Sequence, residues 1–200
     1  MNLKKLVFFC LILCVLIINI NAQDDFYDFS YDRGDQIFTI RAGLFIPLFF
    51  MSPSLDFGST NLSLGGIGAL EWSTYINNRI TIGGELSGMF AFGPNDRVLY
   101  MIPLTAKIAY YFRRYPFEFP IFCGAGINFT TYGDAFSMDF ILKPGASAIW
   151  NFSHEWAFGF NLIYWWVPQL YTGRREGHPP RNHAMFGNFL ETTLSAMFRF

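Results

Sequence analysis

The chain has 200 residues, of which 52% are hydrophobic and 20% aromatic, and its formal net charge is −1. This length fits one domain, and the small net charge gives no indication of nucleic-acid binding. Beyond residue 22 no apolar run approaches the roughly 20 residues of a membrane-spanning helix, which argues against a helical membrane protein. Only Cys123 lies beyond that residue, so a chain cleaved there could form no intrachain disulfide.

Residues 1–22 have the three parts of a secretory signal peptide. Two lysines form a basic start, an almost uniformly apolar stretch follows, and Ala22 supplies the small residue before a cleavage site. One alternative is a retained membrane helix, for which the apolar stretch is short. The other is a lipoprotein signal at Cys14, which lacks the usual small residue before it. We therefore predict export and cleavage after Ala22.

Residues 23–34 are acidic and aromatic, and we expect this segment to trail in the periplasm. Residues 35–200 form the predicted barrel, with eight segments of alternating apolar and polar residues at about 36–50, 62–76, 80–92, 98–112, 118–132, 138–152, 156–171 and 186–200. Each exceeds the roughly 9–11 residues that a tilted strand needs to cross a membrane. Short turns at 77–79, 113–117 and 153–155 alternate with connections at 51–61, 93–97, 133–137 and 172–185.

These features predict an all-β protein, an eight-stranded antiparallel up-and-down transmembrane β-barrel with both termini in the periplasm. Charged residues well inside the strands share the parity of polar residues, as Lys107 does with Thr105, so we place them in the lumen. Aromatic residues gather near the strand ends and predict two interfacial belts. Their members near the turns include Trp72, Tyr75, Tyr110, Phe112, Trp150, Phe152 and Trp156, and those near the other connections include Phe50, Phe90, Phe92, Tyr100, Tyr164 and Trp166.

Four charged residues are predicted to meet in the lumen: Arg41, Glu71, Glu85 and Lys107. Glu71 and Glu85 are symmetric about the turn at Asn78, so they should face each other on paired strands, where like charges repel. Arg41 and Lys107 on the flanking strands would neutralise them. Two interpretations remain open: a packed, charge-balanced lumen, or a gate near the periplasmic mouth.

Three aromatic residues of lumen parity, Phe45, Trp165 and Phe189, lie further from the turns, among small residues. Glycines beside bulky rings could compensate for their shape, or they could leave a pocket for a small hydrophobic ligand. Asp139, Lys143 and Glu191 would supply polar groups at its rim. These six residues form the candidate upper-lumen site.

The last strand alternates in character and ends in Phe198, Arg199 and Phe200. It resembles the C-terminal strand of bacterial outer-membrane barrels, which the barrel assembly machinery recognises. The resemblance implies an outer-membrane location and an assembly signal at Phe198 and Phe200. The overall plan resembles the OmpA-barrel, OmpX and OmpW group, with Arg41 and Pro47 among the residues similar to the first strand of OmpW-type proteins. For the OmpW type, the resemblance implies passage of a hydrophobic ligand.

Two functions follow from the sequence. The first is an outer-membrane barrel that binds or passes small hydrophobic molecules through a narrow, partly plugged lumen. The second is a structural or surface-interaction barrel with a filled lumen, whose loops contact lipopolysaccharide or host components. A continuous apolar cavity would favour the first and a filled lumen the second.

We predict no enzyme, cofactor or metal site. Ser153 and His154 are adjacent in a turn, so their side chains diverge. The loop 172–184 is basic and contains His178 and His183, but their spacing matches no zinc pattern. Its arginines could instead bind lipopolysaccharide phosphates. Membrane lipid and the assembly machinery complete the expected partners.

Overall fold

The structure is a computed structural model, and it describes residues 31–52, 54, 56–94, 97–133, 135–169 and 185–200. The predicted signal peptide, most of the predicted N-terminal segment and the basic loop 172–184 therefore lie outside the described residues. The strands are β1 (Gln36–Met51), β2 (Phe57–Gly58), β3 (Gly65–Tyr75), β4 (Ile80–Phe92), β5 (Val98–Arg114), β6 (Phe117–Tyr132), β7 (Ala135–Asn151), β8 (Trp156–Gln169) and β9 (Met185–Arg199). No helix among the described residues is long and apolar enough to cross a membrane.

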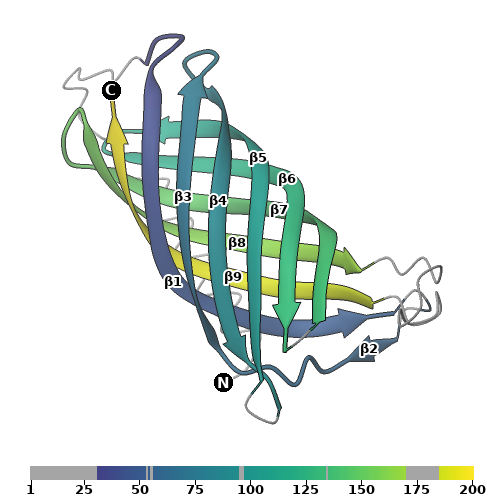
Figure 1. Cartoon of the computed structure of the whole chain (residues 1–200). Helices are drawn as coiled ribbons and strands as arrows, with labels where there is room; N and C mark the ends of the chain where they lie inside the picture. Colours follow the sequence, from purple (N-terminus) through teal and green to yellow (C-terminus); the bar gives the residue numbers. More distant parts are fainter. Residues whose placement is uncertain (1–30, 53, 55, 95–96, 134, 170–184) are drawn as a thin grey trace, which may run out of the picture.

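Eight strands, β1 and β3 to β9, form a closed antiparallel barrel (Figure 1). Each pairs with the next along the chain, and β1 closes the barrel by pairing with β9 from Ile37 opposite Arg199 to Met51 opposite Phe186. Closure pairs the backbone N–H and C=O groups that an open sheet edge would leave without hydrogen bonds in lipid. The predicted all-β barrel is therefore confirmed. The two-residue strand β2, which pairs antiparallel with Phe50 and Met51 at the end of β1, was not predicted.

The two ends of the barrel differ. We call the end with the connections 76–79, 115–116 and 152–155 the turn end, and the opposite end the loop end. Three of the loop-end connections span residues 52–64, 93–97 and 170–184, but the fourth is shorter than predicted, at residues 133–134. Strand β1 begins and β9 finishes at the turn end, where Gln36 and Phe200 exchange backbone hydrogen bonds.

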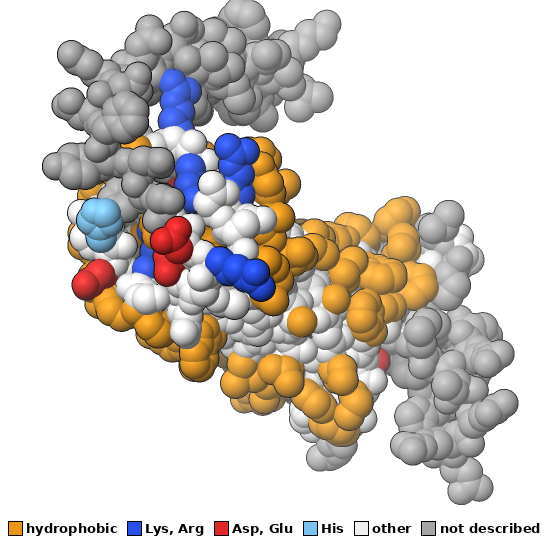
Figure 2. Space-filling view, turned by 90° about the horizontal axis from the view of Figure 1, so that it is seen from above, with side chains coloured by type: hydrophobic (Ala, Val, Ile, Leu, Met, Phe, Trp, Pro, Cys, Tyr) orange, Lys and Arg blue, Asp and Glu red, His pale blue; other side chains and the backbone are white. Residues whose placement is uncertain are grey.

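Exposure alternates along each strand with the predicted parity. On β5, Leu104 is 57% exposed on the outer wall, and the next residue, Thr105, is 3% exposed in the lumen. Hydrophobic side chains cover much of the barrel wall, while most charged side chains visible from this side gather at one end (Figure 2). An outer wall this apolar is the arrangement expected against lipid.

Two residues assigned from sequence to the aromatic belts face the lumen instead. Tyr75, at the turn end of β3, is 1% exposed because its parity is that of Glu71. Phe50 is turned inward by a β-bulge, since the pairing of β1 with β9 shifts by one residue between Pro47 and Phe49. Proximity to a turn or loop was therefore an insufficient guide, because alternation and its interruptions decide which way a ring points.

Candidate functional site

The four charges predicted for the lower lumen do lie together. Strand pairing places Glu71 directly opposite Glu85. Arg41 contacts both carboxylates, with Nη1 3.0 Å from Glu71 Oε2 and Nη2 2.6 Å from Glu85 Oε2. Lys107 Nζ lies 2.5 Å from Glu71 Oε2. The repulsion expected between the opposed glutamates is therefore offset by cations on both neighbouring strands.

Two residues predicted at the rim of an upper pocket join this cluster instead. Lys143, on β7, forms an ion pair with Glu85 and lies 3.5 Å from Glu191 Oε2, while Arg41 Nε lies 3.6 Å from Glu191 Oε1. In the pairing of β1 with β9, Glu191 lies opposite Phe45 rather than opposite Arg41. The strands of a barrel tilt, so side chains at different register positions can reach the same height in the lumen.

We call these six residues the ionic layer: Arg41, Glu71, Glu85, Lys107, Lys143 and Glu191. It contains three cations and three carboxylates, and five of the six residues are at most 5% exposed. Lys107, the most accessible member, has a side chain that is 10% exposed. Buried charges are tolerated when they are paired and hydrogen-bonded. The layer is therefore a neutral plug across the barrel, formed by six different strands.

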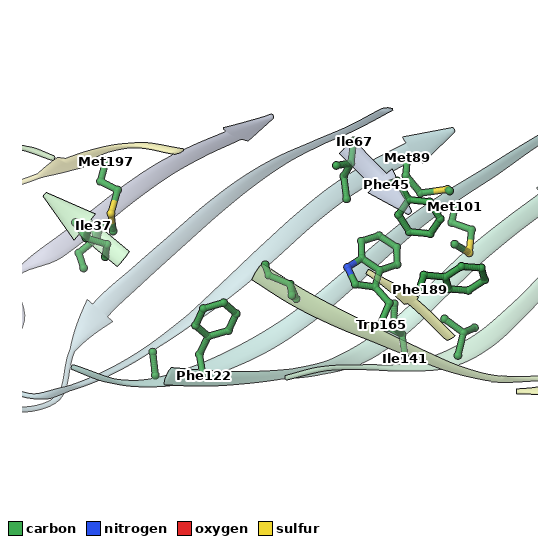
Figure 3. Close-up of a cluster of buried hydrophobic side chains, with 14 of the residues drawn as sticks. Ile37, Phe45, Ile67, Met89, Met101, Phe122, Ile141, Trp165, Phe189 and Met197 are labelled. Atoms are coloured by element: carbon green, nitrogen blue, oxygen red, sulfur yellow. The ribbon is translucent and has the colours of Figure 1, made fainter. Parts of the chain in front are cut away.

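An aromatic layer fills the lumen on the loop-end side of the ionic layer. The ring centroid of Phe45 lies 5.2 Å from that of Trp165 and 5.0 Å from that of Phe189. All three residues are at most 2% exposed, and Figure 3 shows them grouped with Ile67, Met89, Met101 and Ile141. Trp165 Nε1 donates a hydrogen bond of 2.8 Å to Glu191 Oε2, so the two layers are in direct contact.

Asp139 does not join either layer. It lies four residues beyond Lys143 toward the loop end of β7, is partly exposed, and accepts a hydrogen bond of 2.7 Å from Ser137 Oγ. Of the six residues assigned to an upper pocket, three therefore form the aromatic layer, two belong to the ionic layer and one lies apart. The structure does not bring them together around a ligand-sized space.

The glycines near these layers serve two different purposes. A Cβ on Gly145 would lie 2.7 Å from the ring of Phe122, so this glycine makes room for a bulky lumen side chain. A Cβ on Gly126 would lie 2.0 Å from the backbone oxygen of Leu104, so here the neighbouring strand itself comes close. Neither glycine leaves an open pocket.

The cavity found inside the described barrel, between the ionic layer and the turn end, has a volume of about 10 Å³. Its lining includes Thr39, Lys107, Ser147 and Asn161, and it has room for about one water molecule. A larger depression of about 730 Å³ opens beside Trp72, Ile82, Ile108 and Cys123, which have outward parity. Neither of these two cavities is a ligand-sized space within the lumen.

A second polar cluster, which the sequence pattern did not reveal, fills the lumen at the turn end. Arg199 Nη2 lies 2.7 Å from Glu118 Oε2, and Arg199 Nη1 donates hydrogen bonds of 2.6 Å to Asn151 Oδ1 and to the hydroxyl of Tyr31. Tyr31 belongs to the segment expected to trail freely. Residues 23–30 lie outside the described residues, but Tyr31 is 7% exposed and packs inside the barrel.

The remaining candidates from the sequence lie at the turn end or on the outer wall. Ser153 Oγ accepts a hydrogen bond of 2.9 Å from the backbone amide of Trp156, so this hydroxyl caps its turn. Phe198 stacks on Phe200 with centroids 5.8 Å apart, and the ring of Trp156 lies 4.9 Å from that of Phe198. These rings form part of the aromatic belt at the turn end. A role as an assembly signal stays a prediction.

A protein-family model matches residues 21–198, and the fold resembles that of solved outer-membrane proteins. Neisserial surface protein A superimposes with a TM-score of 0.57 at 14% identity, covering 84% of this chain and 97% of that one. The outer membrane protein OprG from Pseudomonas aeruginosa gives 0.55 at 11% identity, covering 86% and 98%. The chain belongs to the family of that model. Its fold is that of the small eight-stranded outer-membrane barrels.

A protein of Borreliella burgdorferi (strain ATCC 35210) with the description "Uncharacterized protein" is similar along most of its length. It is 29% identical over 199 aligned residues, which cover 88% of this chain and 93% of the relative. The similarity therefore extends well beyond one motif.

Proposed function

We propose that the protein is a structural, surface-interaction barrel of the outer membrane with a closed lumen. The observation that carries this proposal is the continuous filling of the lumen by the ionic layer and the aromatic layer, which touch through Trp165 and Glu191. An eight-stranded barrel is just wide enough for its own side chains to fill. Passage of a hydrophobic molecule would require an apolar path, and a neutral layer of paired charges lies across it.

The location in an outer membrane is supported by the apolar wall and by the likeness of the fold to outer-membrane barrels. We propose that the turn end, with both ends of the barrel sequence, faces the periplasm, and that the loop end faces outward. Longer loops outside and short turns inside are the usual asymmetry of such barrels. Lipid, lipopolysaccharide or an equivalent surface component, and the assembly machinery are the partners that this arrangement implies.

The orientation is tested by labelling introduced cysteines on intact cells, with Cys123 replaced by alanine. Ser59, in the loop-end connection, and Asn78, in a turn, are both exposed. A membrane-impermeant maleimide should label Ser59→Cys on intact cells, and Asn78→Cys only after the envelope is opened. The reverse order of labelling would show the opposite orientation.

The closed lumen is tested by planar-bilayer conductance of the refolded protein. Wild-type barrel should give no discrete channels above those of protein-free bilayers. The variant Lys107→Met separates packing from gating, because it removes the most accessible cation of the ionic layer. A packed lumen predicts a weaker but non-conducting barrel, whereas new channels in this variant would identify a gate. Reproducible channels in the wild type, or uptake of a hydrophobic solute by vesicles that contain it, would contradict the proposal.

A further inference from the structure

The residues before β1 turn back into the barrel at the turn end. Gly34 N donates a hydrogen bond of 2.9 Å to the backbone oxygen of Tyr75, and Tyr75 N donates one of 2.9 Å to the oxygen of Asp35. Gly34 has φ +106°, a conformation that a residue with a side chain rarely adopts. The segment is thus tied to the end of β3, and the tie sets the position of Tyr31 over the lumen.

The ring of Tyr31 contacts one aromatic ring and two guanidinium groups. It stacks on Tyr75 with centroids 4.8 Å apart and planes 1° from parallel. The guanidinium carbons of Arg113 and Arg199 lie 4.5 and 4.8 Å from its centroid. Stacking and cation–π contacts of this kind stabilise the folded state more when they are shielded from water.

Glu118 contacts both guanidinium groups near this ring. It lies 2.7 Å from Arg199 Nη2 and 3.4 Å from Arg113 Nε, so two cations share this carboxylate. Guanidinium groups are stabilised further by the electron-rich faces of aromatic rings. Tyr31 supplies one such face and also accepts a hydrogen bond from Arg199.

We propose that residues 31–35 form a stopper that closes the turn-end mouth of the barrel, and that the mouth is a binding site for a phenol ring, occupied in cis by Tyr31. Tyr31 links side chains of β3, β5 and β9 at this point through Tyr75, Arg113 and Arg199. Burial raises the pKa of Tyr31 to about 12, so the ring stays a neutral phenol at physiological pH. The inference goes beyond the proposed function, because the ionic layer closes the lumen whether or not the stopper is in place.

The test uses a reporter cysteine behind the stopper in a Cys123→Ala background. Ala109 is 3% exposed, faces the lumen and lines the small cavity between Tyr111 and Lys107. Refolded barrel in detergent micelles, which leave both mouths accessible, is treated with the anionic thiol reagent 2-sulfonatoethyl methanethiosulfonate. With Tyr31 present, the thiol of the Ala109→Cys variant should react slowly. Tyr31→Ala should raise the rate at least about tenfold.

Three controls make the result specific. Tyr31→Phe keeps the stack and the cation–π contacts, so its labelling rate should stay within about threefold of the parent. Adding 4-methylphenol should slow labelling of the Tyr31→Ala variant, because the free phenol would occupy the vacated site. A reporter at Ala91, which is buried toward the loop end, should label at the same rate with and without Tyr31.

The proposal is overturned by any of three outcomes. Unchanged labelling of position 109 in Tyr31→Ala would show that Tyr31 does not close the mouth. Equal acceleration at positions 109 and 91 would show a general loosening of the barrel. No protection by 4-methylphenol would show that the vacated mouth is not a site for a phenol ring.

Discussion

Lys143 is the member of the ionic layer whose removal should be most damaging. It is 1% exposed and forms ion pairs with Glu85 and, at 3.5 Å, with Glu191. Lys143→Met keeps an unbranched side chain of similar length. It leaves the ionic layer with two cations against three carboxylates in a closed space. Removing one partner of a buried ion pair costs about 3–5 kcal/mol, because the remaining charge stays desolvated. We therefore expect the folding equilibrium constant to fall at least about a hundredfold.

The assay is urea unfolding of the protein in lipid vesicles, followed by tryptophan fluorescence and by the heat-dependent shift of the folded band in gels. The free energy of unfolding is taken from the midpoint and slope of each transition. The double variant Lys143→Met with Glu85→Gln should recover much of the loss, because it restores a charge balance of two against two. Lys107→Met is the matched control and should lose less, since Lys107 is more accessible. Coincident midpoints for wild type and Lys143→Met, or a double variant no better than the single one, would refute the reasoning.

The remaining predictions concern side-chain direction and strand spacing. Leu104→Lys places a charge on the outer wall near mid-strand and should cost about 2–4 kcal/mol in vesicles. Leu104→Phe keeps this 57% exposed position apolar and should cost little. Equal unfolding midpoints for the two variants would show the assignment of faces to be wrong. Gly126→Ala should cost about 1–3 kcal/mol through overpacking, because its Cβ would lie 2.0 Å from a backbone oxygen of the neighbouring strand. Gly124→Ala, two residues away on the same face, meets nothing closer than 3.5 Å and should be tolerated, so similar unfolding midpoints for the two alanine variants would contradict this explanation.

The features that repeat along the chain were predictable from sequence. Alternation with a period of two located all eight barrel strands, and reflection about the turn at Asn78 paired Glu71 with Glu85. Both inferences use only neighbours along one strand or across one turn. They therefore do not depend on how the barrel closes.

Features that depend on closure were not predictable in this way. Lys143 and Glu191 join the ionic layer because the strands tilt, and strand tilt cannot be read from one strand at a time. Phe50 turns inward at a bulge next to Pro47 of β1, and alternation alone does not locate a bulge. Tyr31 lies before the barrel, and it contacts Arg113 from the middle of the sequence and Arg199 from its last strand.

A scan of spin labels along β5, from residue 99 to 111 in lipid vesicles, tests most directly whether the chain is a membrane-spanning barrel with a filled lumen. Relaxation by oxygen, which dissolves in lipid, should rise at Tyr100, Ile102 and Leu104 and fall at the residues between them. Labels at Met101 and Thr105, which face the lumen, should respond neither to oxygen nor to a water-soluble nickel chelate. Strong relaxation of those two positions by the nickel chelate, or equal oxygen accessibility on both faces of the strand, would contradict the account.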